Sequence, residues 1–450
     1  MAFSGGYDKI LIMLVTLLIF IAVLAILVLA HEWGHFIAAR KNGIRVDEFG
    51  FGFPPRIFGI QIFTGQELKK VGETETVEAK IDTYNLPDGR EVIEEKIVDK
   101  IKEVDVAVPV KRWQFVWGNK DVPSTPYGFK GGTVYSLNWI PLGGFVKIKG
   151  EAGDFADEPD SFVFQRVWRR AIVLSAGVTM NFVLAVVFLA VGFMIGLPQS
   201  LDSVSSHARI TDAKIEVQGV LPGSPAALSG VQIGDRIVRA DNLTNLRVTD
   251  LQNYMNLKNG QTVYFGFTRG SESVETEITP ATLSQTGRGG IGVSLLESGI
   301  VSYPWYWAFF EGLRSAVLFS WEILKAFWFL IAGIFRGVPM AENLSGPVGI
   351  AVLTGRVARL GFVYLLQFTA MLSLNLAILN FLPLPALDGG RLLFLAIEKI
   401  IGRPVKRVVE NLIHTVGFAL LMLLVVFITY KDVMRFSGNF VRLGKKIIGI

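Results

Sequence analysis

The stretch ILIMLVTLLIFIAVLAILVLA, residues 10–30, followed at once by His31-Glu32-Trp33-Gly34-His35, decides the fold of this chain. None of the 21 residues from Ile10 to Ala30 is charged. As a helix they span roughly 30 Å, the thickness of a bilayer hydrocarbon core. The run is too long for the core of a cleaved signal peptide, and a metal-type motif stands where a cleavage site would be. The sequence therefore predicts a retained transmembrane helix over residues 1–40.

The histidines that end this helix have the spacing of a metal site. His31 and His35 are four residues apart, so they lie on one helix face, where both rings can reach one ion. Glu32 is close enough to act on a water molecule at that ion. The chain has only four histidines, the others being His207 and His414. The pattern indicates a zinc hydrolase that works at or inside the bilayer.

The composition agrees with a membrane protein. The chain has 450 residues, of which 51% are hydrophobic, and its mean hydropathy is +0.45. This leaves room for one soluble domain or more. Cysteine is absent, which excludes disulfides and thiolate metal ligands. The net charge of +5 is modest and forms no compact basic patch in the sequence, so we expect no nucleic-acid partner.

Three further uncharged stretches, at residues 171–201, 360–387 and 411–430, are long enough to cross a membrane. Together with the first helix they predict four transmembrane helices. The segments expected for these helices are 1–40, 169–201, 360–400 and 411–430, with a basic tail at 431–450.

A β region is expected between the first two helices, over residues 41–168. Gly- and Pro-rich apolar stretches at 49–55 and 138–147 lie next to membrane helices. Non-helical backbone survives there only when it is paired internally or lines a cavity, so a membrane-reentrant hairpin or sheet is predicted. The polar segment between these stretches, residues 65–130, reads as a soluble insertion, in which Asp88-Gly89 predicts a hairpin turn.

Two segments follow the second helix. Residues 203–299 combine strand-like runs with short helices, which predicts a separate α+β domain. Residues 304–338 are apolar, but their charged residues fall within an arc of roughly 80° on a helix. This arc favours amphipathic helices on the membrane surface over a fifth span. The expected fold is a mainly α-helical membrane protein with four transmembrane helices, a membrane-associated β hairpin or sheet and an inserted α+β domain.

A catalytic zinc ion takes three protein ligands, and Asp388 is the best candidate for the third. It closes a long uncharged run, where an acidic group is costly without a cation to pair with. Gly389 and Gly390 remove side-chain bulk, so the backbone can approach another helix closely. The alternative is that Asp388 pairs with Arg391 or caps the helix that begins there. His207 and His414 are weaker rivals as ligands.

Five motifs follow one another along nearly the whole chain. They are His31-Glu32-Trp33-Gly34-His35, residues 138–147, Met180-Asn181, Ser345-Gly346-Pro347-Val348-Gly349-Ile350 and residues 380–390. In these motifs and their order the sequence resembles the bacterial site-2 protease family, in particular the regulator-of-sigma-E type of intramembrane zinc metalloprotease. The stretch from 219 to 241 looks like part of a PDZ domain, so the resemblance implies a PDZ-like domain over 203–299.

The resemblance also assigns roles to the site residues. It implies Zn²⁺ bound by His31, His35 and Asp388, with Glu32 as the catalytic base. It implies that Asn380 binds the backbone of the substrate helix. The other interpretation of Asn380, and likewise of Asn375 and Asn181, is an amide that ties two spans together.

The resemblance further implies a membrane-reentrant β-loop, for which residues 139–149 are the candidate. Peptide bonds inside a transmembrane helix are protected by their own hydrogen bonds, so the protease must unwind them. An edge strand that pairs with an extended substrate would do this. Gly143, Gly144 and Phe145 are therefore expected to bind substrate. The alternative for this stretch is simple structural packing.

The implied substrates are single-span membrane proteins, such as anti-sigma factors or remnant signal peptides, already cut by another protease. The PDZ-like domain would bind a chain end beside Leu221-Pro222-Gly223 and act as a size filter, although it could also be a spacer. The implied location is the bacterial inner membrane, with the PDZ-like domain outside and the active site toward the cytoplasm. Basic residues flanking 41–168 agree with this topology, whereas the basic tail at 431–450 does not.

Two functions from other classes remain open at this point. One is a catalytically silent membrane scaffold that binds proteins through the PDZ-like domain, against which the intact Glu32 and ligand set argue. The other is a transporter or channel with an intramembrane metal site. The sequence has no repeat of broken helices to support a transporter.

Overall fold

A computed structural model describes residues 4–85, 89, 91–118, 129–130, 132–201, 204–244, 247–270, 272–283, 287–336 and 345–448. The chain forms two compact units. One contains residues 24–177 and 394–407, and the other contains residues 1–23, 178–393 and 408–450. Several long helices run from one unit into the other, as the element bounds show.

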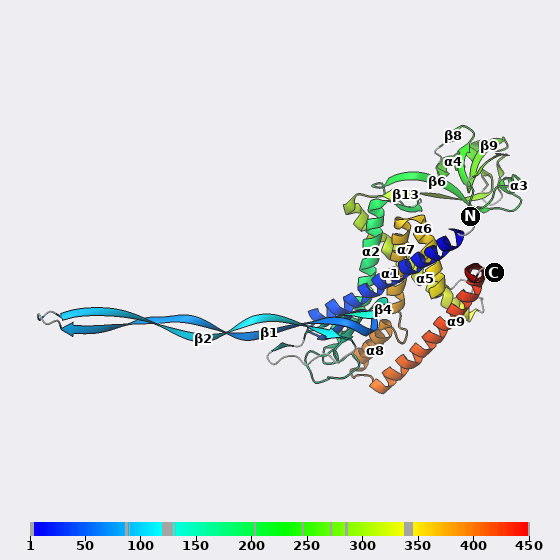
Figure 1. The fold of residues 1–450 in the computed structure, drawn as a ribbon. Helices are drawn as coiled ribbons and strands as arrows, with labels where there is room; N and C mark the ends of the chain where they lie inside the picture. The colour runs from blue at the N-terminus through cyan, green and yellow to red at the C-terminus, as the bar shows by residue number, and fades with distance from the viewer. Residues whose placement is uncertain are drawn as a thin grey trace. The chain divides into compact units, whose positions relative to one another are not determined.

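The long helices follow the apolar runs of the sequence (Figure 1). Among the described residues, five helices are long and apolar enough to cross a membrane. The expected number of four is therefore not confirmed, because the segment expected as surface helices forms the single long helix α5. The long helices are α1 (Ser4–Lys41), α2 (Val167–Ile195), α5 (Trp305–Phe335), α7 (Phe362–Phe381) and α9 (Arg407–Ile448), and the shorter ones are α6 (Pro347–Leu360) and α8 (Asp388–Ile401).

The first unit is built on a β-sheet, as expected for residues 41–168. Strand β1 (Val46–Asn85) pairs antiparallel with β2 (Glu91–Trp117), with β3 (Phe129–Lys130) and with β4 (Val134–Ile148). Figure 1 shows β1 and β2 as one long twisted hairpin. The two strands confirm a hairpin in the 65–130 insertion, although Asp88 of the expected turn lies outside the described residues.

Bends in β1 and β4 let short parts of each strand pair twice. Residues 134–137 pair with 48–51 and also with 58–61, whereas residues 144–147 pair only with 48–51. The segment 144–148 is therefore an edge of the sheet, as far as the described residues show. This edge carries the last part of the stretch that the sequence singled out for substrate pairing.

The helices of the second unit pack through small residues. Ala185 of α2, Ala308 and Ala316 of α5, and Ala370 of α7 are all fully buried in one cluster. The Ser373 hydroxyl, also fully buried, donates to the Asn181 carbonyl oxygen at 2.7 Å. Small side chains and hydrogen bonds from hydroxyl groups are typical of helix packing in lipid. Lipid is as apolar as the side chains, so burying apolar side chains between helices gives little driving force there.

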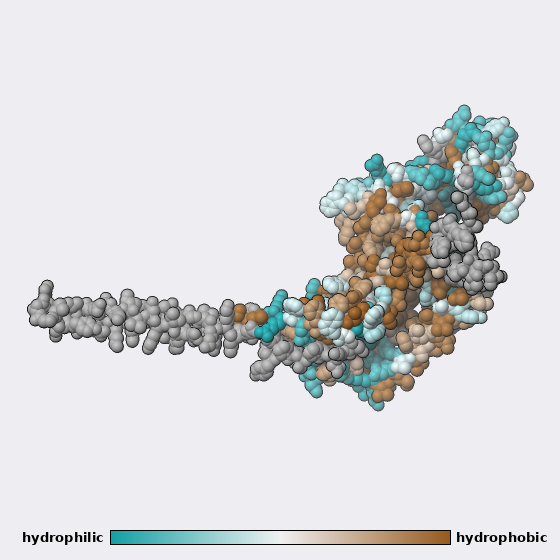
Figure 2. All heavy atoms as spheres, viewed as in Figure 1, coloured by the Kyte–Doolittle hydropathy of each residue, from teal (hydrophilic) through white to brown (hydrophobic). Residues whose placement is uncertain are grey.

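The strand-rich domain of this unit has its own core. Its sheet has the strand order β10-β9-β7-β6-β13-β5, and the core is formed by side chains such as Ile215, Phe265, Phe267 and Leu251. Figure 2 shows mainly hydrophilic residues over this domain and hydrophobic ones over the helices. The elements are β5 (Leu197–Ser200), β6 (Arg209–Val220), α3 (Pro225–Leu228), β7 (Arg236–Ala240), β8 (Leu243–Thr244), α4 (Val248–Leu257), β9 (Val263–Arg269), β10 (Glu272–Ile278), β11 (Ala281–Thr282), β12 (Gly289–Gly290) and β13 (Val293–Ser302).

A buried carboxylate stabilises the turn of this domain that precedes β7. Asp235 is 1% exposed and accepts two hydrogen bonds of 2.7 Å from Arg269, and one of 2.8 Å from the Gln232 amide. The hydrogen bonds from Arg269 hold the pKa of Asp235 below its ordinary value of 3.8, against the opposing effect of burial. Because the folded pKa is lowered, the stabilisation is complete above about pH 3.8 and is lost as the pH falls further.

Replacing Asp235 with asparagine should lower the free energy of unfolding of this domain by about 2–3 kcal/mol, because it leaves Arg269 without its charged partner. Hydrogen–deuterium exchange on the full-length protein measures the loss, region by region. The matched control is Glu275→Gln, which breaks the exposed pair between Glu275 and Arg239. The control should change the free energy of unfolding of the domain by less than about 0.5 kcal/mol. Equal effects of the two variants would contradict the assignment.

Candidate metal centre

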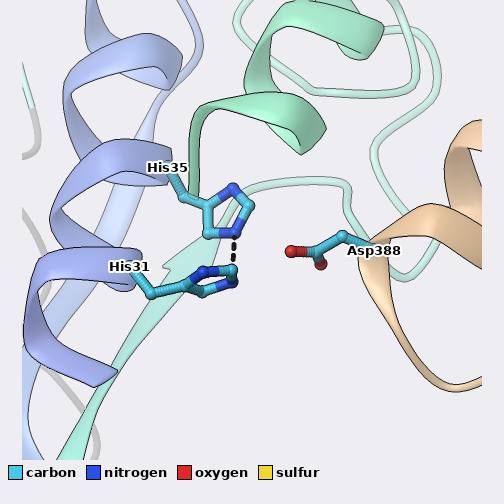
Figure 3. Close-up of side chains that lie close together, drawn as sticks. All are labelled: His31, His35 and Asp388. Carbon is cyan, nitrogen blue, oxygen red and sulfur yellow. Dashed lines mark hydrogen bonds between the residues drawn. The ribbon is translucent and has the colours of Figure 1, made fainter. Parts of the chain in front are cut away.

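The structure brings together the three residues that the sequence proposed as zinc ligands. Donor atoms of His31, His35 and Asp388 all lie within 4.8 Å of one another. In Figure 3 the two rings on α1 face the carboxylate at the start of α8. The histidines are 7% and 6% exposed, and Asp388 is half-buried. Two imidazoles and one carboxylate form a donor set that zinc uses in catalytic sites.

The two rings are oriented for a shared ion. Their Nε2 atoms lie 3.1 Å apart. Two nitrogens at a normal zinc distance in a tetrahedral site would lie about 3.3–3.4 Å apart, so the spacing fits. The His35 Nδ1–H donates to the Val173 carbonyl oxygen at 2.8 Å, which fixes the tautomer and turns Nε2 toward the shared site as the ligand atom. The residues present therefore fit a zinc ion.

Gly177 on α2 keeps the space beside the rings open. A Cβ atom added there would lie 2.4 Å from His35 Nε2 and 2.7 Å from His31 Nε2, far inside contact distance. No local pattern in the sequence points to this residue, because a glycine in an apolar helix carries no sign that it lies close to a histidine 142 positions earlier in the sequence.

Gly177→Ala should therefore displace the ligand rings and lower zinc affinity by at least about 10-fold, since changes next to metal ligands commonly cost 10- to 100-fold. The measurement is zinc content after dialysis against a graded chelator. A matched control is Gly219→Ala in β6, where the added methyl would meet nothing closer than 3.6 Å. Unchanged zinc retention in Gly177→Ala would show that the rings can move aside without cost.

Glu32 lies next to the edge of the β-sheet. Its Oε2 accepts a hydrogen bond of 3.1 Å from the Val146 amide, and the side chain is half-buried. Because Val146 lies in the segment that pairs with 48–51 on its other side, this amide points away from the sheet, toward the metal motif. The carboxylate expected to act as the base and the strand expected to hold substrate are thus in direct contact.

Gly143 and Gly144 allow that strand to lie close to α1. A Cβ at Gly143 would meet Val28 at 2.5 Å, and Gly143 has a φ of +118° that favours glycine. A Cβ at Gly144 would meet the Gly50 oxygen at 2.7 Å. Phe145 is half-buried and its ring packs over Gly50. These contacts are structural, so they account for the three residues without reference to substrate and leave substrate binding as a prediction.

The backbone before Asp388 is held by a histidine. His414 of α9 accepts a hydrogen bond of 2.9 Å at Nδ1 from the Ala386 amide, and Ala386 has a φ of +72°. His414 is thus not a member of the His–His–Asp group but positions the turn before the acid. The close backbone approach expected at Gly389 is made to the residues that end α7. A Cβ atom at Gly389 would overlap the Leu382 carbonyl oxygen.

The remaining candidates lie outside the metal group among the described residues. Asn380 is half-buried in the last turn of α7, and Asn181 is fully buried on α2. His207 is exposed, and its ring stacks on Trp307 with centroids 4.2 Å apart. His207 is therefore not brought to the metal site.

Comparisons with known proteins cover most of the chain. The model of the family "Peptidase family M50" matches residues 19–69 and 123–424. The chain is 32% identical to "Regulator of sigma-W protease RasP" of Bacillus subtilis, over 93% of this chain and 98% of that protein. It is 31% identical to "Zinc metalloprotease RasP" of Geobacillus kaustophilus, over 93% of this chain and 97% of that protein.

Solved structures match a smaller part. The crystal structure of the PDZ domain of the SdrC-like protein from Listeria monocytogenes is 25% identical, covering 19% of this chain and 92% of that one, with a TM-score of 0.18.

Proposed function

This chain belongs to peptidase family M50, and on that premise we propose that His31, His35 and Asp388 hold the zinc ion of this intramembrane metalloprotease. The observation that carries the proposal is that the donor atoms of these residues, from distant parts of the chain, lie within 4.8 Å of one another. A zinc ion bound there supplies Lewis acidity, which activates a water molecule and polarises the scissile carbonyl.

Glu32 is proposed as the general acid–base. Its carboxylate would take the proton of the attacking water and then deliver it to the leaving amine. Glu32 directly follows the ligand His31 in the sequence, so the backbone of α1 holds the two side chains at fixed places relative to each other.

The outer edge of residues 144–148 is proposed to bind substrate by strand pairing. The outward-pointing amide of Val146 and the carbonyl groups of this edge can pair with an extended peptide, and the contact with Glu32 places that peptide beside the base. Gly143, Gly144 and Phe145 would serve this binding by fixing the strand on α1. Asn380, at the end of α7, is proposed to bind the substrate backbone nearby.

Single-span membrane proteins already shortened by another protease, such as anti-sigma factors or remnant signal peptides, are the proposed substrates. The PDZ-like domain would act as the size filter, with a chain end bound beside Leu221-Pro222-Gly223. We place the enzyme in the bacterial inner membrane, with this domain outside and the active site toward the cytoplasm. Basic residues near the ends of α1 and α2, such as Arg40, Lys41 and Arg170, support this topology.

Four of the five apolar helices are proposed to cross the membrane, with α5 lying against them near the surface. This helix carries charged residues along its length, including Glu311, Arg314, Glu322 and Lys325. Each acid is paired with a base three residues later, so the helix tolerates an interfacial position.

The test of the size filter is cleavage, in membranes, of one single-span substrate made in two lengths. The form with a short outer segment should be cut at least about 10-fold faster than the form with a folded outer domain, because only the short form can pass the filter. Band intensities of tagged products measure the ratio. The control is the same pair with the enzyme variant Glu32→Gln, which reports background proteolysis. Equal rates for the two lengths would remove the size filter and leave the PDZ-like domain as a spacer.

A further inference from the structure

A cavity of about 710 Å³ lies where the end of α1 meets the base of the β1–β2 hairpin. None of the proposed zinc ligands lines it. Its polar lining includes three cations, three hydroxyl groups and one carboxylate. These are Arg40, Arg45, Lys111, Thr64, Thr133, Tyr135 and Asp160.

The charges in this cavity do not balance. Asp160 is paired with Lys149 at 2.7 Å, and Arg45 is paired with Asp47 at 3.0 Å. Arg40 donates to the Tyr135 hydroxyl at 3.3 Å, and neither Arg40 nor Lys111 has a carboxylate partner within the part of the chain that the structure describes. Two cations thus remain to attract an anion.

The carbonyl groups at the end of α1 do not oppose an anion here. The last turn of a helix leaves carbonyl oxygens whose partial negative charge would repel it. In this protein the Asn42 side chain donates to the Ala38 oxygen at 2.8 Å, and the Ile44 amide donates to the Ala39 oxygen at 2.9 Å. The Gly43 amide donates to the Arg40 oxygen at 3.2 Å.

An exposed apolar face continues from the cavity along the hairpin. In the antiparallel register Lys111 lies opposite Thr64, and the next pairs on the same face are Trp113 with Ile62, Phe115 with Ile60 and Trp117 with Phe58. Ile62 also lines the cavity. We name these last three pairs the aromatic ladder. At the base of the hairpin, Figure 2 shows hydrophobic atoms beside hydrophilic ones.

The ladder is open to its surroundings although it is strongly hydrophobic. Trp113 is 65% exposed, Phe115 49% and Trp117 64%, and the first two rings lie edge to face with centroids 5.2 Å apart. Tryptophan and neighbouring apolar residues with this exposure are typical of the boundary between lipid headgroups and acyl chains.

The sequence of α1 places the cavity at the level of the lipid headgroups. The uncharged run from Ile10 to Ala30 is long enough to cross the hydrocarbon core, and the first basic residues after it are Arg40 and Lys41, in the last turn of α1. Basic side chains at the end of a membrane helix lie at the boundary between lipid and water. Arg40 therefore lies in the polar layer.

We propose that this cavity binds the headgroup of an anionic phospholipid, with Arg40 and Lys111 contacting the phosphate and the aromatic ladder resting at the acyl-chain boundary. Guanidinium and ammonium groups are the usual partners of phosphate oxygens. The Tyr135 hydroxyl, which accepts from Arg40, can donate a further hydrogen bond to the phosphate. The site is distinct from the zinc centre and does not depend on the proposed catalytic roles.

The test is native mass spectrometry of the full-length protein, titrated in detergent with phosphatidylglycerol or phosphatidylcholine. We expect the wild type to bind phosphatidylglycerol with clear preference. The variant Arg40→Gln/Lys111→Gln should bind it roughly 30-fold more weakly, because each cation that contacts the phosphate directly contributes about a 5-fold factor. The matched control Lys41→Gln/Arg112→Gln removes the same charge from neighbouring positions that do not line the cavity, and should change affinity less than about 3-fold.

Two further arms separate a lipid from a free phosphate. Trp113→Ser, at an exposed position, should weaken phosphatidylglycerol binding several-fold. Glycerol phosphate in solution should compete only at concentrations at least about 100-fold higher than the lipid. Equal weakening by the two charge variants, or no preference for phosphatidylglycerol, would overturn the proposal. Equal competition by glycerol phosphate would overturn the assignment to a lipid. Unchanged zinc content and thermal unfolding in each variant establish that the fold is intact.

Discussion

Replacing Glu32 with glutamine should lower the rate of substrate cleavage at least about 10³-fold while zinc stays bound. Glutamine keeps the size of the side chain and can still lie against the Val146 amide, but it cannot accept the proton of the attacking water. A positioned acid–base group commonly contributes 10²- to 10⁴-fold to the rate. The measurement is cleavage of a tagged single-span substrate in membranes, with zinc determined in the same preparation.

The control for this variant is Glu151→Gln, which changes an acid in the turn after β4 away from the metal group. It should cleave at close to the wild-type rate. Loss of zinc together with activity would mean that Glu32 holds the site together rather than acting on water. Full activity of Glu32→Gln would assign the base to another group, and a wild type that binds zinc but cleaves nothing would revive the scaffold interpretation.

Asp388→Asn should reduce zinc affinity by more than about 100-fold and abolish cleavage at ordinary zinc concentrations. Even groups that only support a ligand cost 10- to 100-fold when they are changed, and here a charged ligand is replaced by a neutral amide. Chelator competition with the purified full-length protein measures the affinity.

Glu410→Gln is the matched control, since it removes a carboxylate from the first turn of α9, outside the His–His–Asp group. It should retain zinc as the wild type does. Should Asp388→Asn keep its zinc, the acid would be a helix-start residue of α8 rather than a ligand, which is the alternative that the sequence left open.

The sequence predicts those site residues that belong to local sequence patterns. His31, Glu32 and His35 follow from helical periodicity. Asp388 follows from the cost of an acid at the end of an apolar run, and the structure brings it near the two rings. Gly177, His414 and the Val146 amide could not be predicted in this way. Their roles arise from contacts between residues far apart in sequence, and no local pattern records those contacts.

The number of long apolar helices was not predicted: five are found among the described residues, whereas the charged arc of α5 favoured a surface position over a fifth span. In α5, Glu311 pairs with Arg314 at 3.2 Å, and Glu322 pairs with Lys325 at 2.7 Å. Pairs within one helix offset part of the cost of each charge, so the charges alone do not decide whether such a helix crosses the membrane. The β1–β2 hairpin was predicted from the Asp88-Gly89 turn between strand-like runs, but the length of its strands was not, because strand length in a polar segment has no clear signature.

The bond between Glu32 and the Val146 amide has a consequence for the order of events. One amide hydrogen serves one good acceptor at a time, so a substrate strand that pairs with the edge would take this hydrogen from the carboxylate. On the proposed mechanism, arrival of an unwound peptide therefore removes one hydrogen bond from the carboxylate at the moment when the substrate is in place. A transmembrane helix that stays wound cannot pair with the edge, so it leaves the surroundings of the base unchanged.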